Sequence, residues 1–139
     1  MLNNKTNNIM CSIVSYIDSV NDKIVGKGAS ETEIEYAQIA LKVKFNEEYL
    51  EVLKNYGCLL IKGETLFGVV KNKSYDVVYN TMIEKERYQS IPEEMYVISS
   101  LGIEGVLILQ NEDGAIFEFT DGHPLKLIYD SLLDYLKSL

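Results

Sequence analysis

Histidine, cysteine and serine often act as nucleophiles or bases, and this sequence places them in no recognisable catalytic arrangement. The single histidine, His123, lies in an Asp-Gly-His-Pro stretch that is typical of a surface turn. A Cys–His or Ser–His pair would have to use this histidine, yet no signature places Cys11, Cys58 or a serine beside it. Both cysteines lie in apolar stretches, so we expect buried thiols. No catalytic residue is predicted.

The sequence also has no pattern that is typical of a metal or cofactor site. Zinc sites need about four cysteine, histidine or carboxylate ligands, and a calcium loop needs oxygen ligands at alternate positions before a bidentate glutamate. Asn111-Glu112-Asp113-Gly114 offers oxygen ligands, but it is short and has the residue types of a tight hairpin turn. We therefore predict no metal and no cofactor.

Four acidic residues form the other group that could act together. They are close enough in sequence to converge: Glu112, Asp113, Glu118 and Asp121. Carboxylate pairs catalyse hydrolysis in some enzymes, and acidic side chains on hairpins commonly form a solvated face. A local surplus can also form an electrostatic contact surface for a basic protein. We predict these four residues as partner contacts, with a small hydrolase as the least favoured alternative.

Charge and composition limit the class of protein. The 139 residues carry a net charge of −8, and residues 91–139 hold nine acidic residues against two lysines. An acidic surface repels phosphate backbones and anionic membranes and speeds encounter with basic partners. No apolar run approaches the ~18 residues of a membrane helix, and residues 1–9 do not resemble a secretion signal. We expect one cytoplasmic domain over residues 1–139 that binds neither nucleic acid nor membrane.

Hydrophobic periodicity and capping residues predict three helices in the first part of the chain. The first has an apolar stripe and ends near residues 26–28, which we interpret as a helix stop and linker and not as a phosphate loop: Ile9, Ile13, Ile17, Val20 and Ile24. Ser30 and Glu33 form a capping box that starts the second helix, whose inward residues are Ile34, Ala37 and Leu41. Asn46 caps the third, which ends at Gly57 and has the inward face Tyr49, Leu50, Leu53 and Tyr56.

Short apolar runs separated by turns predict strands in the rest of the chain. The runs cover residues 58–61, 65–70, 95–99, 105–109 and 115–119, with a hairpin turn at 111–114 and a further strand at 126–129. In the second arm of the hairpin we expect Phe117 and Phe119 to face the core and Glu118 to face water. A short helix is predicted within residues 75–88, and Asp130 or Ser131 can cap a last one. This order favours an α+β fold.

Several of these stretches, in this order, resemble the SMI1/KNR4 family of the SUKH superfamily. Phe45-Asn46-Glu47-Glu48-Tyr49 resembles the family's leucine-proline, acid, acid, tyrosine step. Leu66-Phe67-Gly68 resembles its short strand ending in glycine, residues 111–119 its hairpin, and residues 130–136 its closing helix. The likeness covers residues 30–139, with residues 1–29 as an N-terminal helix and linker. The sequence departs from the pattern at Asn46, where proline is usual, at Gln38, where glutamate is frequent, and in having no tryptophan.

The resemblance implies a twisted, mostly antiparallel sheet packed against helices. It also implies a bacterial immunity protein that neutralises a cognate polymorphic or contact-dependent toxin by binding the toxin domain. That domain could be a basic nuclease, whose substrate surface an acidic protein would cover. The alternative that the resemblance implies is a regulatory scaffold in cell-wall or signalling assemblies. Neither alternative fixes the toxin's identity or the oligomeric state of this chain.

Overall fold

The computed structural model describes the backbone of residues 4–139 and the side chains from residue 12 onward. In chain order the elements are α1 (Asn4–Ser19), β1 (Lys23–Val25), α2 (Glu31–Leu41), α3 (Glu47–Tyr56), β2 (Leu59–Ile61), β3 (Glu64–Leu66), the 3₁₀ turn η1 (Lys73–Tyr75), α4 (Val77–Arg87), β4 (Tyr96–Ser100), β5 (Val106–Gln110), β6 (Ile116–Thr120), β7 (Lys126–Tyr129) and α5 (Leu132–Lys137). The predicted α+β class is confirmed by these helices and by two antiparallel sheets.

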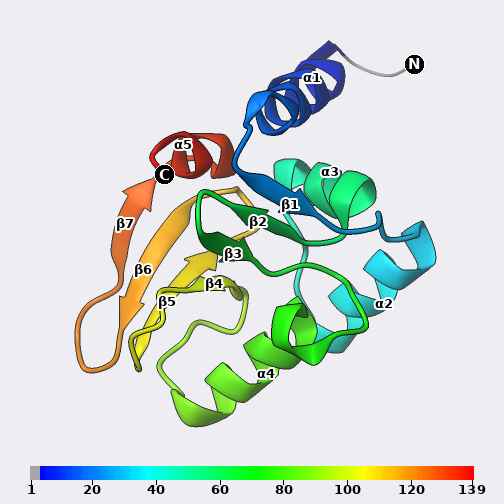
Figure 1. Ribbon diagram of the computed structural model, residues 1–139. Coiled ribbons are helices and arrows are strands. Elements are labelled where there is room, and N and C mark those ends of the chain that lie inside the picture. The colour runs from blue at the N-terminus through cyan, green and yellow to red at the C-terminus, as the bar shows by residue number, and fades with distance from the viewer. Residues whose placement is uncertain (1–3) are drawn as a thin grey trace.

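The helices surround the two sheets (Figure 1). One sheet has the strand order β1-β2-β3 and the other β4-β5-β6-β7, so strands that follow one another in sequence mostly lie side by side. The amide of Phe67 donates to the carbonyl of Ile98 at 2.8 Å, which joins the sheets between β3 and β4. In Figure 1, α4 lies below the sheets, α2 to the right, and α1 and α5 above. No described helix is both long and apolar enough to cross a membrane.

The first helix ends earlier than its apolar spacing predicts. Residues 23–25 form β1, where Ile24 pairs with Leu60 of β2 and is 68% exposed. The predicted inclusion of Ile24 in the helix is therefore wrong. The physical reason is that Lys23-Ile24-Val25 finds strand partners far away in sequence, and β-branched residues suit a strand. The predicted stripe position Ile9 lies outside the residues whose side chains are described.

The boundaries of α2 and α3 agree with the predicted caps. Ser30 accepts from the amide of Glu33 at 3.1 Å, and the Glu33 carboxylate accepts from the amide of Ser30 at 2.9 Å, which is the predicted capping box. Asn46 accepts from the amide of Glu48 at 3.1 Å, and Gly57 ends α3 with φ +74°. These predictions are confirmed. The sequence alone identifies such caps because a cap depends on a few adjacent residues.

Helices pack on both faces of the four-stranded sheet. Tyr96 of β4 stacks on Tyr49 of α3, with ring centroids 5.3 Å apart. On the opposite face of the sheet, Phe119 packs against Tyr88 beyond the end of α4, at 5.6 Å. The prediction that Phe117 and Phe119 of β6 face the core and Glu118 faces water is confirmed only in part. Phe119 is buried, but Phe117 and Glu118 are both half-buried, and Ile116, on the side of Glu118, is fully buried.

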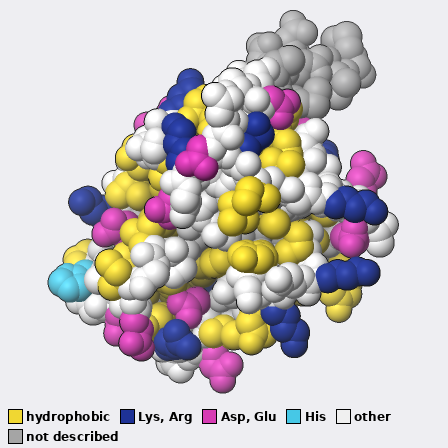
Figure 2. All heavy atoms as spheres, in the orientation of Figure 1, with side chains coloured by type: hydrophobic (Ala, Val, Ile, Leu, Met, Phe, Trp, Pro, Cys, Tyr) yellow, Lys and Arg dark blue, Asp and Glu magenta, His cyan; other side chains and the backbone are white. Residues whose placement is uncertain are grey.

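The face seen in Figure 2 mixes charged and apolar side chains. Hydrophobic side chains gather near its centre, over the three-stranded sheet, and acidic and basic side chains alternate around them (Figure 2). On β1 of this sheet, Ile24 and Val25 are both exposed. The acidic residues are thus not concentrated on this face, although the net charge is −8.

Candidate functional site

The predicted acidic contact residues begin in the turn between β5 and β6. Residues 111–114, called the acidic turn below, place Glu112 and Asp113 at its tip, and both are exposed. The Asn111 side chain accepts from the amide of Ala115 at 3.0 Å, and the amide of Gly114 donates to the carbonyl of Asn111 at 3.0 Å. These short-range bonds close the turn, as expected for an asparagine at its first position.

The acidic turn is also fixed to the rest of the molecule by side chains. Asn46 donates from Nδ2 to the carbonyl of Glu112 at 3.2 Å while it caps α3. Gln110 donates to the carbonyl of Gly114 at 3.1 Å and accepts from the Tyr96 hydroxyl at 2.8 Å. The Tyr96 hydroxyl in turn accepts from the amide of Asn46 at 2.9 Å. Because these partners are buried or half-buried, the two carboxylates are presented from a rigid support.

In the part of the chain whose side chains are described, Glu112 has one weak ion-pair partner. Its carboxylate lies 3.9 Å from the Lys44 ammonium, and the two side chains are 62% and 79% exposed. An exposed ion pair of this kind contributes about 0–1 kcal/mol. The Glu112 carboxylate can therefore exchange Lys44 for a basic group of a partner at little cost.

The other two predicted acids lie elsewhere on the hairpin. Glu118 is on β6 and pairs across the sheet with Lys126 of β7. Asp121 follows the far end of β6, where its amide donates to the carbonyl of Gly105 at 3.1 Å. β6 has five residues, so at about 3.3 Å each roughly 16 Å of strand separates the acidic turn from Asp121. The structure thus brings Glu112 and Asp113 together and keeps Glu118 and Asp121 apart from them.

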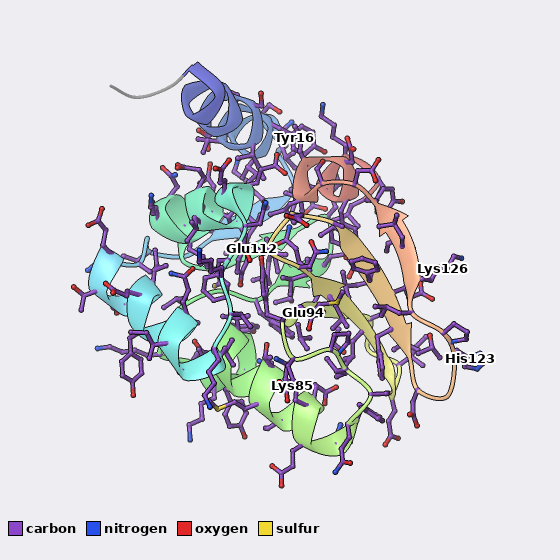
Figure 3. All side chains as sticks on the ribbon, turned by 180° about the vertical axis from the view of Figure 1, so that it is seen from behind. Tyr16, Lys85, Glu94, Glu112, His123 and Lys126 are labelled. Atoms are coloured by element: carbon purple, nitrogen blue, oxygen red, sulfur yellow. The ribbon has the colours of Figure 1, made fainter. Side chains whose placement is uncertain are left out.

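In Figure 3, which views the molecule from behind, Glu112 lies near the centre of the view. Lys126, the cross-strand partner of Glu118, and His123 lie at the outer edge of the sheet. His123 is exposed in the β6–β7 turn, as predicted. Among the residues whose side chains are described, no three histidine, cysteine or carboxylate groups cluster in a way that could hold a metal ion.

The cysteines agree only in part with the prediction. Cys58 is a free thiol that is half-buried, and burial raises its pKa above the ordinary value. A raised pKa favours the neutral thiol, which is a poor nucleophile. The side chain of Cys11 lies outside the described residues.

An open groove beside the acidic turn has no counterpart in the sequence predictions. It has a volume of about 580 Å³ and lies next to α2, and we call it the α2 groove. Its lining includes four apolar residues, Ile39, Val43, Phe45 and Leu50, and the charged residues Glu35, Lys42, Lys44, Glu94 and Glu112. Figure 3 shows Glu112 and Glu94 between α2 and the four-stranded sheet. Ile39 could have signalled this surface, because it falls off the inward stripe of α2.

Two comparisons with known proteins bear on the family. A family model with the description "SUKH_5: SMI1-KNR4 cell-wall" matches residues 9–139. The match includes most of α1, which packs against α3, and so begins well before the residues that carry the resemblance in the sequence. A comparison with curated proteins gave no match.

Proposed function

This chain belongs to the SMI1/KNR4 family of the SUKH superfamily, and we propose that it is a bacterial immunity protein that neutralises a cognate toxin by binding the toxin domain. In this proposal the protein acts by stoichiometric contact, with no chemistry of its own. It would work in the cytoplasm, where a toxin that has entered or been made in the cell must be blocked. Family membership is consistent with such a role.

The observation that supports this proposal most is the acidic turn. It carries two exposed carboxylates on a support fixed by Asn46, Tyr96 and Gln110. Preorganised charges of one sign favour fast and specific association with a partner of the opposite sign, because little conformational entropy is lost on binding.

The acidic residues also indicate the chemistry of the partner. We propose that Glu112, Asp113, Glu118 and Asp121 contact a basic surface, such as the substrate groove of a nuclease. A standard interface buries about 800 Å² on each partner, a patch roughly 30 Å across, which is wider than the ~16 Å of strand between the acidic turn and Asp121. One partner surface can therefore reach all four residues.

A regulatory scaffold is the second candidate function. The matched family model has "cell-wall" in its description, which keeps a role in cell-wall assemblies in view. Such a scaffold would bind several partners weakly, whereas an immunity protein would bind one partner tightly.

Co-expression with a candidate toxin domain from a neighbouring gene tests the proposal. We expect cell survival together with co-purification of a one-to-one complex. Cell death without a complex would contradict the immunity function and favour the scaffold. Rescue without a complex would contradict neutralisation by binding.

A further inference from the structure

Helix α2 carries a second apolar face that nothing in the described chain covers. Its inward residues Ile34, Ala37 and Leu41 are buried, as predicted. Tyr36 and Ile39, three residues apart and therefore neighbours on the helix surface, are 73% and 66% exposed. A surface helix usually has one apolar stripe and one polar face, and exposed aromatic and aliphatic residues beside a concave surface are typical of binding sites.

The α2 groove continues this face into the body of the protein. Ile39 is at its border, and Val43, Phe45 and Leu50 supply apolar side chains to its lining. Val43 and Phe45 are only 8% and 4% exposed, so they form its floor. Ile39 belongs both to the exposed face and to the groove lining, so the two apolar surfaces meet at this residue.

The floor of the groove is already ordered without a partner. The amide of Phe45 donates to the Gln38 side chain at 2.9 Å, and the amide of Val43 donates to the Gln38 carbonyl at 3.1 Å. The Phe45 ring packs edge-on against Tyr49 and Tyr96 at centroid distances of 5.1 and 4.9 Å. A partner segment would therefore meet a preformed surface, which reduces the entropic cost of binding.

The charges around the groove select the kind of partner. Three carboxylates, Glu35, Glu94 and Glu112, stand against Lys42 and Lys44, and Lys44 lies 3.9 Å from Glu112. The excess is negative, as in the whole chain. A second copy of this chain is a poor fit, because it also carries a net charge of −8 and would be repelled by this negative surface.

We propose that the α2 groove binds a segment of the toxin domain in which an apolar side chain is flanked by lysine or arginine. The apolar side chain lies on Val43, Phe45 and Leu50 beside Ile39, and the flanking cations meet Glu35, Glu94 and Glu112. This inference rests on the proposed function, since it names the surface through which the toxin is held.

A random peptide library displayed on phage tests the groove without any toxin. The full chain is the bait, and recovered peptides are then measured against Ile39→Gln and against Ile103→Gln. Ile103 is a matched control, because it is 64% exposed and lies in the β4–β5 loop. Circular dichroism confirms that the variants are folded.

We expect recovered peptides to place an apolar residue beside lysine or arginine and to bind Ile39→Gln about tenfold or more weakly. Binding to Ile103→Gln should stay within about twofold of the parent. The double variant Glu35→Gln/Glu94→Gln should weaken the basic peptides and leave neutral ones unchanged. Peptides without this pattern, or equal binding to Ile39→Gln and the parent, would overturn the proposal.

Sedimentation of the peptide-free chain tests whether a second copy of the chain occupies the groove. A dimer that becomes a monomer in Ile39→Gln would assign the groove to a second copy and overturn the proposal, whereas a monomer in both supports it. The result is separable from the toxin test. If the groove test fails but co-expression rescues the cells, the toxin contact lies outside the groove. If the groove binds the expected peptides but co-expression does not rescue the cells, the proposed neutralisation is rejected and the groove proposal stands.

Discussion

Asn46 joins two parts of the molecule that are far apart in sequence. Its side chain caps α3 and also donates to the carbonyl of Glu112, and its amide donates to Tyr96. A proline, usual at this position in the family that the sequence resembles, would lack both the amide proton and the side-chain amide. In this chain the asparagine therefore ties the acidic turn to the start of α3.

We expect Asn46→Ala to lower the free energy of unfolding by about 1–2 kcal/mol, because it removes a helix cap and a bond to the turn. Chemical denaturation measures the change. Asn55→Ala is the control, since the Asn55 side chain donates to the Glu51 carbonyl within α3, and its effect should stay near 0.5 kcal/mol or below. Equal losses in the two variants would show that Asn46 has no special structural role.

The environment of Glu48 should make the stability of the protein depend on pH. Partial burial raises the pKa of this carboxyl above 4.5, and the amide of Leu133, which donates to it at 3.4 Å, opposes that shift. Since the folded pKa is above the unfolded one, the folded state binds more protons between the two values, and stability falls as pH rises through that window.

Glu48→Gln should remove this penalty. The variant's unfolding free energy, relative to that of the parent, should therefore be higher at pH 7.5 than at pH 4.5. Glu47→Gln, an exposed change in the same first turn of α3, controls for the loss of a charge at a helix start. A pH-independent difference for Glu48→Gln would contradict the assignment.

At the scale of elements, the acidic turn depends on close packing at Gly114. A Cβ at this position would lie 2.8 Å from Nδ2 of Asn46, and its φ is +97°. Gly122, in the β6–β7 turn, has φ +81° but nothing within 4 Å of such a Cβ. The two glycines therefore share an unfavourable backbone conformation for other residues and differ in the space around them.

We expect Gly114→Ala to destabilise the protein by roughly 1 kcal/mol more than Gly122→Ala, because only the first substitution adds a clash to the backbone strain. Thermal or chemical unfolding of the two variants gives the difference. Toxin binding should weaken in Gly114→Ala, since the turn must shift. Equal stabilities of the two variants would mean that the Asn46 contact is easily displaced.

Elements defined by neighbouring residues could be predicted from the sequence. The caps at Ser30 and Asn46 and the hairpin turn at 111–114 each depend on a few adjacent side chains, and all are confirmed. β1 was not predictable in the same way, because its strand character comes from pairing with Leu59–Ile61, which is far along the chain. Its apolar residues fitted a helical stripe equally well.

The candidate site was predictable only in part, for a similar reason. The sequence identifies Glu112 and Asp113 as turn residues, but how far they lie from Asp121 depends on β6 being extended throughout. The α2 groove combines Ile39 with residues 43–50, Glu94 and Glu112, and only the tertiary fold brings these together. The spacing of apolar residues alone does not show that Tyr36 and Ile39 remain exposed.

At the scale of the whole molecule, the net charge of −8 predicts that partner binding weakens as salt is added. Exposed charges are screened over about 8 Å at physiological ionic strength. Interactions between a basic toxin surface and the acidic hairpin, meaning Glu112, Asp113, Glu118 and Asp121, should therefore appear mainly in the association rate and its salt dependence.

Charge reversal separates the acidic hairpin from this general effect. Glu112→Lys/Asp113→Lys and Glu118→Lys/Asp121→Lys should each weaken toxin binding, the first by about tenfold or more, and both should reduce its salt dependence. Asp22→Lys/Glu86→Lys changes the net charge equally at exposed positions in the α1–β1 connection and on α4, and it should have a smaller effect. Unchanged affinity and salt dependence after reversal of all four hairpin residues would remove them from the interface.

We propose that this protein neutralises a toxin by binding it stoichiometrically and not by modifying it. The most direct test is a titration of the purified toxin domain's activity with the purified full chain at concentrations far above Kd. We predict a linear fall in activity that reaches zero at one equivalent. Complete loss of activity at a small fraction of an equivalent would indicate a catalyst, and full activity in the presence of excess protein would contradict neutralisation.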